Sequence, residues 1–214
     1  MTTKRILAVI LATVMVLGAN VSVSASTNSE LPTIQADVPT FLSNEQLQEL
    51  IEQAPDATET RSDTTLADRR ITEAELLAWI EEYRELGANA FELEVVRLIN
   101  IERENYNLNP LAINPNLMMA ARFHSQEMVE LRYFSHRSPH HGRGIYRAEM
   151  FGHENIQEHV WGVRENISSG VRTPQQVVQA WMNSPGHRAA ILGEIYLTIG
   201  VGTVQNSTTV KFGA

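Results

Sequence analysis

The chain has 214 residues, a formal net charge of -8 and no cysteine. Its acidity argues against nucleic acid and anionic membrane surfaces as partners, because both attract proteins rich in lysine and arginine. The lack of cysteine excludes disulfide bonds, thiolate metal ligands and cysteine catalysis, so an apolar core must stabilise the fold.

The first residues have the features of a secretory signal peptide. Lys4 and Arg5 form a short basic region, residues 6–17 are apolar, and small residues lead to a cleavage site after Ala25. The apolar stretch is too short to span a bilayer comfortably, so no stable membrane span is expected after cleavage; an uncleaved anchor is the alternative. Removing residues 1–25 takes away two basic residues and changes the charge from -8 to -10. We predict a secreted, extracellular or cell-envelope protein.

A polar, acidic segment follows the signal peptide. Residues 26–70 are poor in aromatics and interrupted by prolines, which predicts a flexible spacer. One short helix is expected within it, with Ser43 as its N-cap and Leu47, Leu50 and Ile51 along one side.

Residues 71–87 are expected to form an additional helix. Thr72 and Glu75 have the spacing of a capping box, apolar residues follow at helical spacing, and Gly87 ends the pattern. The sequence leaves open whether this helix is a stalk or packs on the domain.

The domain proper is predicted to cover residues 88–214, where helical patterns alternate with a few short strand patterns. Residues 133–152 are irregular in pattern, rich in histidine and basic. Helix patterns cover residues 91–103, 116–131 and 173–182, and strand patterns cover residues 196–204 and 208–212. This order indicates an α+β or three-layer domain.

His187 lies in an informative run, residues 181–192. Ser184 can be the N-cap and Pro185 the first residue of a short helix, which places His187 in its first turn. The positive end of the helix dipole disfavours an imidazolium, so His187 should be neutral near neutral pH. A neutral imidazole can bind a metal ion or accept a proton.

Several segments, in the same order along the chain, together resemble the CAP superfamily, also called the SCP-like extracellular domain, and its bacterial branch most of all. They are Leu98-Ile99-Asn100 with Glu102-Arg103, Leu111 with Asn114-Pro115, Ala120-Ala121-Arg122 with His124-Ser125, Phe134-Ser135-His136, Glu165-Asn166-Ile167, and Trp181 through Leu192 with Ile199-Gly200-Val201-Gly202. The resemblance implies a three-layer α-β-α sandwich with a surface cleft. Here a signal peptide and a partly helical, partly disordered segment precede that domain.

The resemblance also implies a site. The family's cleft is built around two histidines and two glutamates, and the matching positions hold His136, His187 and Glu165. The second glutamate has no clear counterpart, and Asn183 or Ser184 stands where it would lie.

Two further departures from the family pattern lie near this set. Arg164 precedes Glu165 where the family usually has glycine, and His140 and His141 replace a common aspartate-glycine pair. We include Arg164 and His140, with Asn183 and Ser184, as additional cleft residues. His124 is expected to be a hydrogen-bonded packing residue instead.

Two neutral imidazoles and one carboxylate can hold Zn²⁺ and leave a fourth position open for water. We therefore expect a divalent metal, most simply zinc, on His136, His187 and Glu165. Without the resemblance, the separation of these residues in sequence would favour structural roles for each histidine.

Two functions follow from this set. The first is a secreted or cell-envelope binding module that takes a metal ion or a small polar, lipid or peptide ligand and associates with the cell wall. The second is a metal-dependent, peptidase-like hydrolase in which Glu165 is a ligand or the catalytic general base. The missing second glutamate favours the binding module. A serine hydrolase is disfavoured because the chain lacks a Gly-x-Ser-x-Gly motif.

Overall fold

The computed structural model describes residues 42–53, 70–153 and 162–214, all of which belong to one compact unit, Leu31–Ala214. The signal peptide predicted for residues 1–25 lies outside these ranges, as does most of the predicted spacer. In chain order the described elements are α1 (Asn44–Gln53), α2 (Glu73–Leu86), α3 (Ala90–Asn105), β1 (Ala112–Ile113), α4 (Pro115–Glu130), α5 (Gly144–Met150), β2 (Val163–Ser169), α6 (Pro174–Met182), α7 (Pro185–Ile191), β3 (Thr198–Val204) and β4 (Ser207–Gly213).

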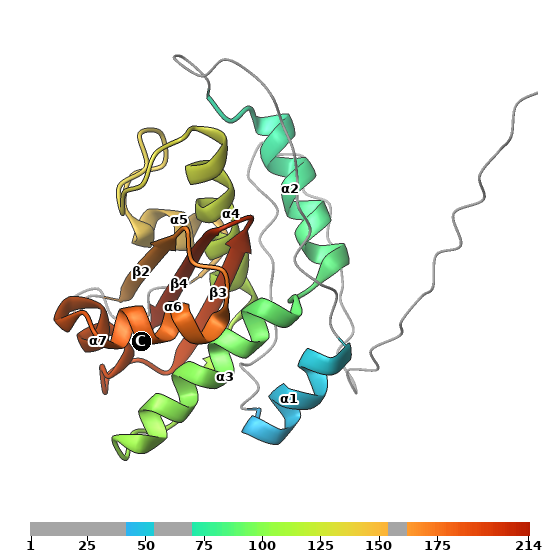
Figure 1. Cartoon of the computed structure of the whole chain (residues 1–214). Helices are drawn as coiled ribbons and strands as arrows, with labels where there is room; N and C mark the ends of the chain where they lie inside the picture. The colour runs from blue at the N-terminus through green and yellow to red at the C-terminus, as the bar shows by residue number, and fades with distance from the viewer. Residues whose placement is uncertain (1–41, 54–69, 154–161) are drawn as a thin grey trace, which may run out of the picture. The chain divides into compact units, whose positions relative to one another are not determined.

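These elements form the expected α-β-α sandwich (Figure 1). The sheet has the order β1-β3-β4-β2, with β1 parallel to β3 and the other neighbours antiparallel. Helix α4 covers one face of the sheet, while α3 and α6 cover the other (Figure 1). Every residue of β3 and β4 is buried, so the two central strands form the middle of the core.

Two glycines allow α4 to lie directly on β3. A Cβ atom at Gly202 would be 2.0 Å from the backbone nitrogen of Arg122, and one at Gly200 would be 2.2 Å from the backbone of Leu117. No side chain fits in either space. The helix is correspondingly enclosed, with a continuous buried run at residues 116–128.

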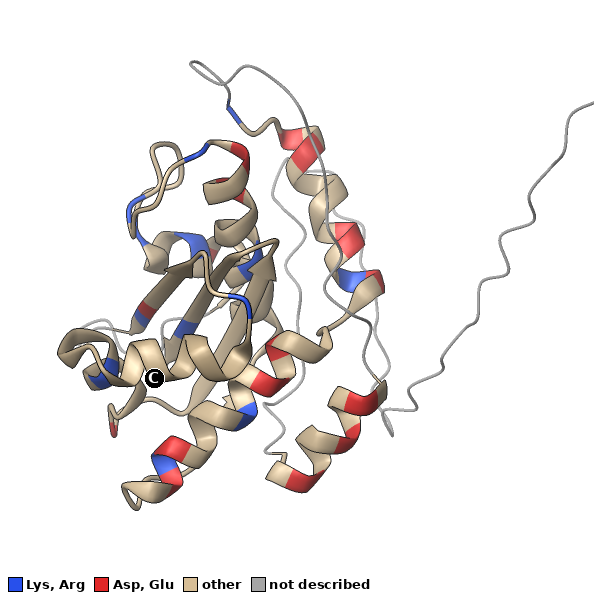
Figure 2. Cartoon of the chain, viewed as in Figure 1, with Lys and Arg blue, Asp and Glu red and all other residues tan. Residues whose placement is uncertain are grey.

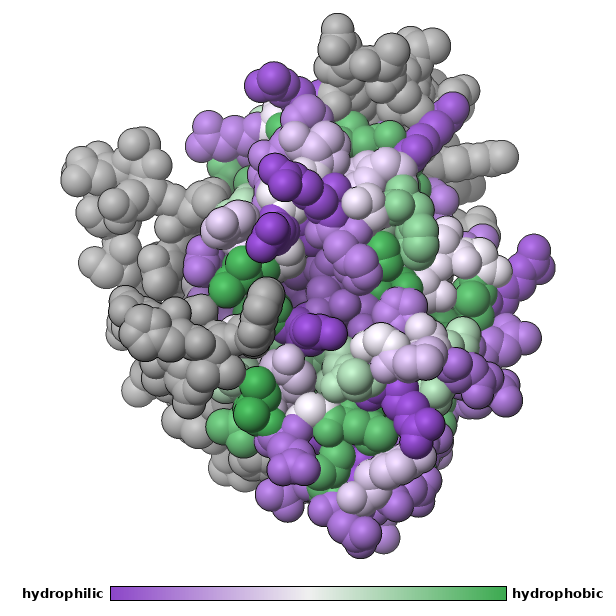
Figure 3. Space-filling model, turned by 90° about the vertical axis from the view of Figure 1, so that its left-hand side faces the viewer, coloured by the Kyte–Doolittle hydropathy of each residue, from purple (hydrophilic) through white to green (hydrophobic). Residues whose placement is uncertain are grey.

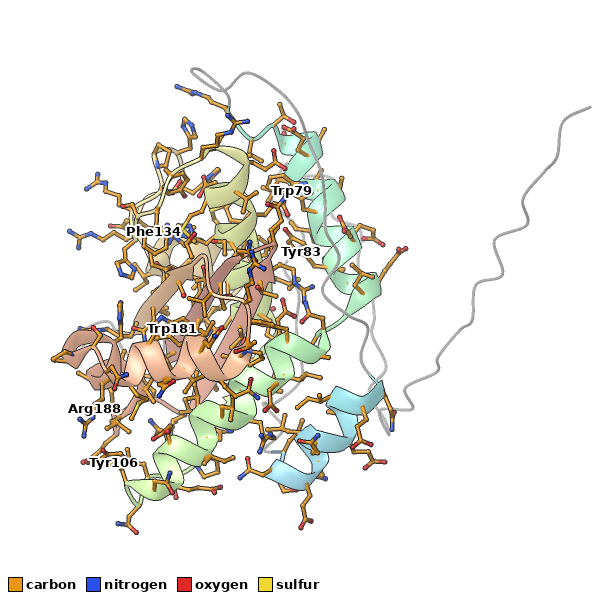
Figure 4. All side chains as sticks on the ribbon, in the orientation of Figure 1. Trp79, Tyr83, Tyr106, Phe134, Trp181 and Arg188 are labelled. Atoms are coloured by element: carbon orange, nitrogen blue, oxygen red, sulfur yellow. The ribbon has the colours of Figure 1, made fainter. Side chains whose placement is uncertain are left out.

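Helix α2 packs on the outer side of α4, which decides between the two alternatives left open above. Ile80 and Tyr83 of α2 share an apolar cluster with Phe123 of α4. Figure 4 shows Trp79 and Tyr83 on the side of α2 that faces the domain. The capping box predicted at Thr72 is present.

Helix α1 packs against α3 in the same way. Leu47 is buried within the main core cluster, and the Asn44 amide donates to the Glu104 carboxylate at 3.1 Å. Ser43 and Gln46 form the predicted cap, with the Ser43 backbone nitrogen 2.8 Å from Gln46 Oε1. The helix predicted at this position is therefore confirmed.

The sequence predicts irregular structure throughout residues 133–152, which is wrong for α5 (Gly144–Met150). No side chain caps the start of this helix, so the usual local signal is missing. Arg147 holds it through tertiary contacts instead. The short strand β1 and the strand β2 were also not predicted, since neither shows a clear alternation of apolar residues.

Candidate functional site

The candidate site lies where β2 and β4 meet α5, the end of α4 and the loop between α4 and α5. Glu165 of β2 and Lys211 of β4 are direct partners across the antiparallel pair. Arg147 reaches them from α5, and His136 reaches them from the loop. We call these four residues the Glu165 cluster.

Three donor groups surround the Glu165 carboxylate. Its Oε1 lies 3.1 Å from His136 Nδ1 and 3.1 Å from Arg147 Nη2, and its Oε2 accepts from Arg147 Nη2 at 2.9 Å and Lys211 Nζ at 2.5 Å. The side chain is only 6% exposed. Burial alone raises the pKa of Glu165, but Lys211, the His136 hydrogen bond and Arg147 together hold it well below its usual range.

Two buried cations neutralise this carboxylate. Burial lowers the pKa of Lys211 to about 8, against the opposing effect of Glu165. Arg147 is fully buried and also donates to the carbonyl oxygens of Gly142 at 2.5 Å and His136 at 3.1 Å. Arg147 thus joins α5, the loop and β2 at one point.

Gly144 makes this close approach sterically feasible. A Cβ atom there would lie 2.9 Å from Glu165 Oε2 and 3.1 Å from Lys211 Nζ. Its carbonyl oxygen also accepts from Lys211 Nζ at 3.1 Å. No sequence signal indicates Arg147, Lys211 or Gly144 as site residues, because nothing local to any of them points to Glu165 as a partner.

A second buried carboxylate, Glu127 of α4, fastens the loop. It accepts from the Tyr133 hydroxyl at 2.6 Å, the Ser138 hydroxyl at 2.7 Å and His141 Nδ1 at 2.7 Å. Burial raises the pKa of Glu127, but these hydrogen bonds and the nearby His124 outweigh it and hold the pKa well below its usual range. The sequence does contain a signal for a buried carboxylate here. Glu127 lies three residues after His124, on the same side of a helix whose other side chains are mostly apolar.

The three histidines discussed above have different surroundings. His136 is 54% exposed, whereas the His124 side chain is fully buried, with Nε2 3.1 Å from the Ser135 carbonyl oxygen and Nδ1 3.3 Å from the Tyr133 hydroxyl. His124 is therefore the hydrogen-bonded packing residue that the sequence predicts. Burial and the neighbouring His136 lower the pKa of His187, which agrees with the predicted neutral imidazole.

The four residues expected as additional members of the cleft, Arg164, His140, Asn183 and Ser184, lie in different parts of the structure. Arg164 is exposed on β2 next to Glu165. Because neighbouring residues of a strand point to opposite sides of the sheet, Arg164 does not face the Glu165 carboxylate. The counter-charges of Glu165 are Lys211 and Arg147. His140 is exposed, with its ring 6.3 Å from that of His141.

Ser184 and Asn183 lie in the turn between α6 and α7. Ser184 is the N-cap residue of α7 but makes no side-chain capping hydrogen bond. Asn183 lines a mainly apolar hollow of about 310 Å³, whose other lining residues are Met182, Pro185, Arg188, Ala189 and Leu192. Figure 4 shows Arg188 beside Tyr106 at this end of the molecule, where their side chains are joined by a 2.6 Å hydrogen bond.

The expected three-ligand metal site does not fit these contacts. Glu165 already contacts three donor groups, and two of them, Arg147 and Lys211, are buried positive charges that disfavour a further cation. Within the described ranges, no group of three or more histidine, aspartate or glutamate side chains is placed to hold a metal ion. Of the three expected ligands, His136 contacts Glu165, and His136 lies near enough to His187 to lower its pKa.

The α-β-α architecture with this polar cluster at one end of the sheet defines an SCP-like domain. The chain belongs to the cysteine-rich secretory protein family, CAP, whose model matches residues 96–213. It does so without any cysteine of its own.

Two bacterial relatives support the bacterial branch that the sequence resemblance indicates. The chain is 42% identical over 122 residues to the uncharacterized protein YkwD of Bacillus subtilis, covering 57% of this chain and 46% of that protein. It is 33% identical over 121 residues to the uncharacterized membrane protein YlbC of the same organism, covering 56% of this chain and 34% of that protein. The matches thus span less than half of either relative.

A solved structure shares the fold. It is an extracellular protein from Bacillus anthracis that contains an SCP domain, and it matches with a TM-score of 0.56 and 27% sequence identity. The match covers 68% of this chain and 45% of that one.

Proposed function

We propose that this chain is an extracellular binding module that takes a small polar ligand on the surface formed by His136 and His187. The Bacillus anthracis neighbour is described as extracellular, and the signal peptide predicted for residues 1–25 agrees with export. Among the described helices, none is long and apolar enough to cross a membrane.

The observation that carries this proposal is that the Glu165 carboxylate is buried and held by three donor groups. A general base needs a free lone pair directed at the substrate and a pKa near the working pH. Glu165 instead gives its acceptor positions to His136, Arg147 and Lys211, and its pKa is held far below neutral. This arrangement supports binding over the metal-dependent hydrolase.

Glu165 acts through His136 in this proposal. The Glu165 carboxylate favours the tautomer of His136 that carries its proton on Nδ1, which leaves a lone pair on Nε2. The neutral His187 supplies a second imidazole nearby. An imidazole oriented by Glu165, with a second neutral imidazole nearby, suits a ligand that carries hydroxyl or acidic groups.

Nuclear magnetic resonance of the full chain with labelled histidines tests this proposal. The probes are acetate, inorganic phosphate, N-acetylglucosamine and Zn²⁺, each added alone. We expect at least one probe to shift the His136 and His187 ring signals together, and His136→Ala to abolish the shift at His187. His140→Ala is the matched control, because His140 is an exposed imidazole on the same loop.

Two results would count against the binding module. One is the absence of any joint shift of His136 and His187 with all four probes. The other is turnover of a peptide or ester library by the Zn²⁺-loaded chain that disappears in Glu165→Gln, which would favour the hydrolase.

A further inference from the structure

The loop between α4 and α5 carries a basic surface on an otherwise acidic chain. Arg132, Arg137 and Arg143 are all exposed, and no acidic residue occurs between positions 131 and 148. Figure 2 shows blue segments along this loop. Figure 3, which looks onto this side of the molecule, shows hydrophilic side chains gathered over the upper part of the face.

The three guanidinium groups make no side-chain hydrogen bond or ion pair with any residue that the structure describes. Other arginines differ in this respect. Arg97 pairs with Glu94 at 2.7 Å, and Arg122 pairs with the buried Glu92. Within the described part of the chain, the loop arginines thus have no internal counter-charge.

Two aromatic rings lie among these arginines. Phe134 and Tyr146 are each 57% exposed, which is high for large aromatic side chains. The Tyr146 ring lies on Gly142, where an added Cβ would be only 2.9 Å from Tyr146 Cδ2. Figure 4 shows Phe134 near the outer edge of the same loop.

Hydrogen bonds to Glu127 of α4 and a β-bridge within the loop fix its conformation. Glu127 binds Tyr133, Ser138 and His141, and Ser138 pairs with Gly142 in a β-bridge. A loop already fixed in this way loses little conformational entropy when it binds a partner.

We propose that Arg132, Arg137, Arg143, Phe134 and Tyr146, here called the basic loop surface, bind a linear phosphodiester polymer of sugar or polyol units. Guanidinium groups pair with phosphate oxygens in a bidentate geometry, and the exposed rings offer apolar faces against which the CH groups of the connecting units pack. The choice of an extracellular polymer over nucleic acid rests on the extracellular placement proposed above.

The flanking charges favour a narrow chain over a lipid bilayer. Glu130 and Glu149 border the basic loop surface, and the whole chain carries a net charge of -8. A flat anionic membrane laid over this surface would also approach these carboxylates and be repelled by them over a range of about 8 Å at physiological salt. A single polymer chain can follow the arginines without meeting them.

The test measures binding of a fluorescent glycerol-phosphate oligomer to the full chain at several salt concentrations. We expect Arg132→Gln, Arg137→Gln and Arg143→Gln combined to weaken binding tenfold or more, and to reduce the slope of log affinity against log salt by about 2. The matched control combines Arg70→Gln, Arg84→Gln and Arg172→Gln, three exposed arginines elsewhere, which should keep the slope. The thermal midpoints of all variants should agree.

Two further measurements test the aromatic rings and compare the polymer with other anionic partners. Phe134→Ser and Tyr146→Ser should each weaken binding about threefold without changing the salt slope. Equal binding to phosphatidylglycerol vesicles or to single-stranded DNA of the same charge would overturn the assignment, as would equal losses in the control triple variant. His136→Ala with His187→Ala should retain polymer binding, so failure of this inference is distinguishable from failure of the proposed function.

Discussion

Lys211 and Glu165 face each other across β4 and β2, with Lys211 Nζ 2.5 Å from Glu165 Oε2 in a nearly water-free setting. Lys211 is one of only two lysines in the chain. A buried carboxylate with this partner is an integral part of the fold, and this relationship determines how the candidate site behaves.

Removing the lysine should therefore destabilise the protein. In Lys211→Met the Glu165 carboxylate keeps Arg147 but loses its shortest hydrogen bond, and breaking a buried pair on one side costs about 3 kcal/mol. Urea unfolding at pH 7 measures this loss. The double variant Lys211→Met with Glu165→Gln should recover part of it, and a double variant less stable than the single one would contradict the pairing.

The same lysine predicts an unusual rise in stability at alkaline pH. Its pKa in the folded state is about 8, below the ordinary value of 10.5, so between these values the unfolded state binds more protons. Stability should therefore increase as pH rises from about 8 towards 10, by up to about 3 kcal/mol. Urea midpoints across this range check the prediction, and Lys211→Met should lack the increase.

Acid should have the opposite effect through the two buried carboxylates. The folded-state pKa values of Glu127 and Glu165 both lie well below the usual 4.5, so their contribution is present above that pH and is lost as pH falls below it. Urea midpoints should drop between pH 5 and pH 3. Glu127→Gln should be less stable at pH 7 and show a shallower drop, and an unchanged drop would assign the acid sensitivity elsewhere.

The contact between α4 and β3 should tolerate no side chain at Gly202. In Gly202→Ala the new Cβ would lie 2.0 Å from the Arg122 backbone nitrogen, and backbone atoms cannot move aside cheaply, so we expect a loss of about 3 kcal/mol or more. Gly186→Ala is the control, since no atom lies within 4 Å of its added Cβ. Thermal unfolding of the two variants should differ by several degrees, and equal midpoints would be incompatible with this packing.

The packing of α2 on the domain can be tested by truncating one side chain on each of its faces. Ile80 is 6% exposed and contributes to the cluster with Phe123, so Ile80→Ala should cost about 2 to 4 kcal/mol. Leu77 is 42% exposed, and Leu77→Ala should stay within about 0.5 kcal/mol. Equal stabilities in chemical denaturation would instead favour an independent stalk.

The sequence by itself was sufficient for features with local causes. The capping boxes at Ser43 and Thr72 form between residues three positions apart, and both are present. A full capping box was also expected at Thr173, where only the hydrogen bond from the Gln176 backbone nitrogen to the Thr173 hydroxyl forms. Helical periodicity predicted α4 and α6 for the same reason, because side chains three and four residues apart share one face.

Only the tertiary structure decided the environment of the candidate site. Glu165 and His136 were predicted as members of one site, and their 3.1 Å contact brings them together. The neutralisation of Glu165 was not foreseeable, because Arg147 lies 18 residues and Lys211 lies 46 residues away in the chain. Their approach depends on strand pairing and on the space left by Gly144, and neither has a local sequence signal. A carboxylate that the sequence presents as a metal ligand is therefore an internal ion-pair partner in the folded protein.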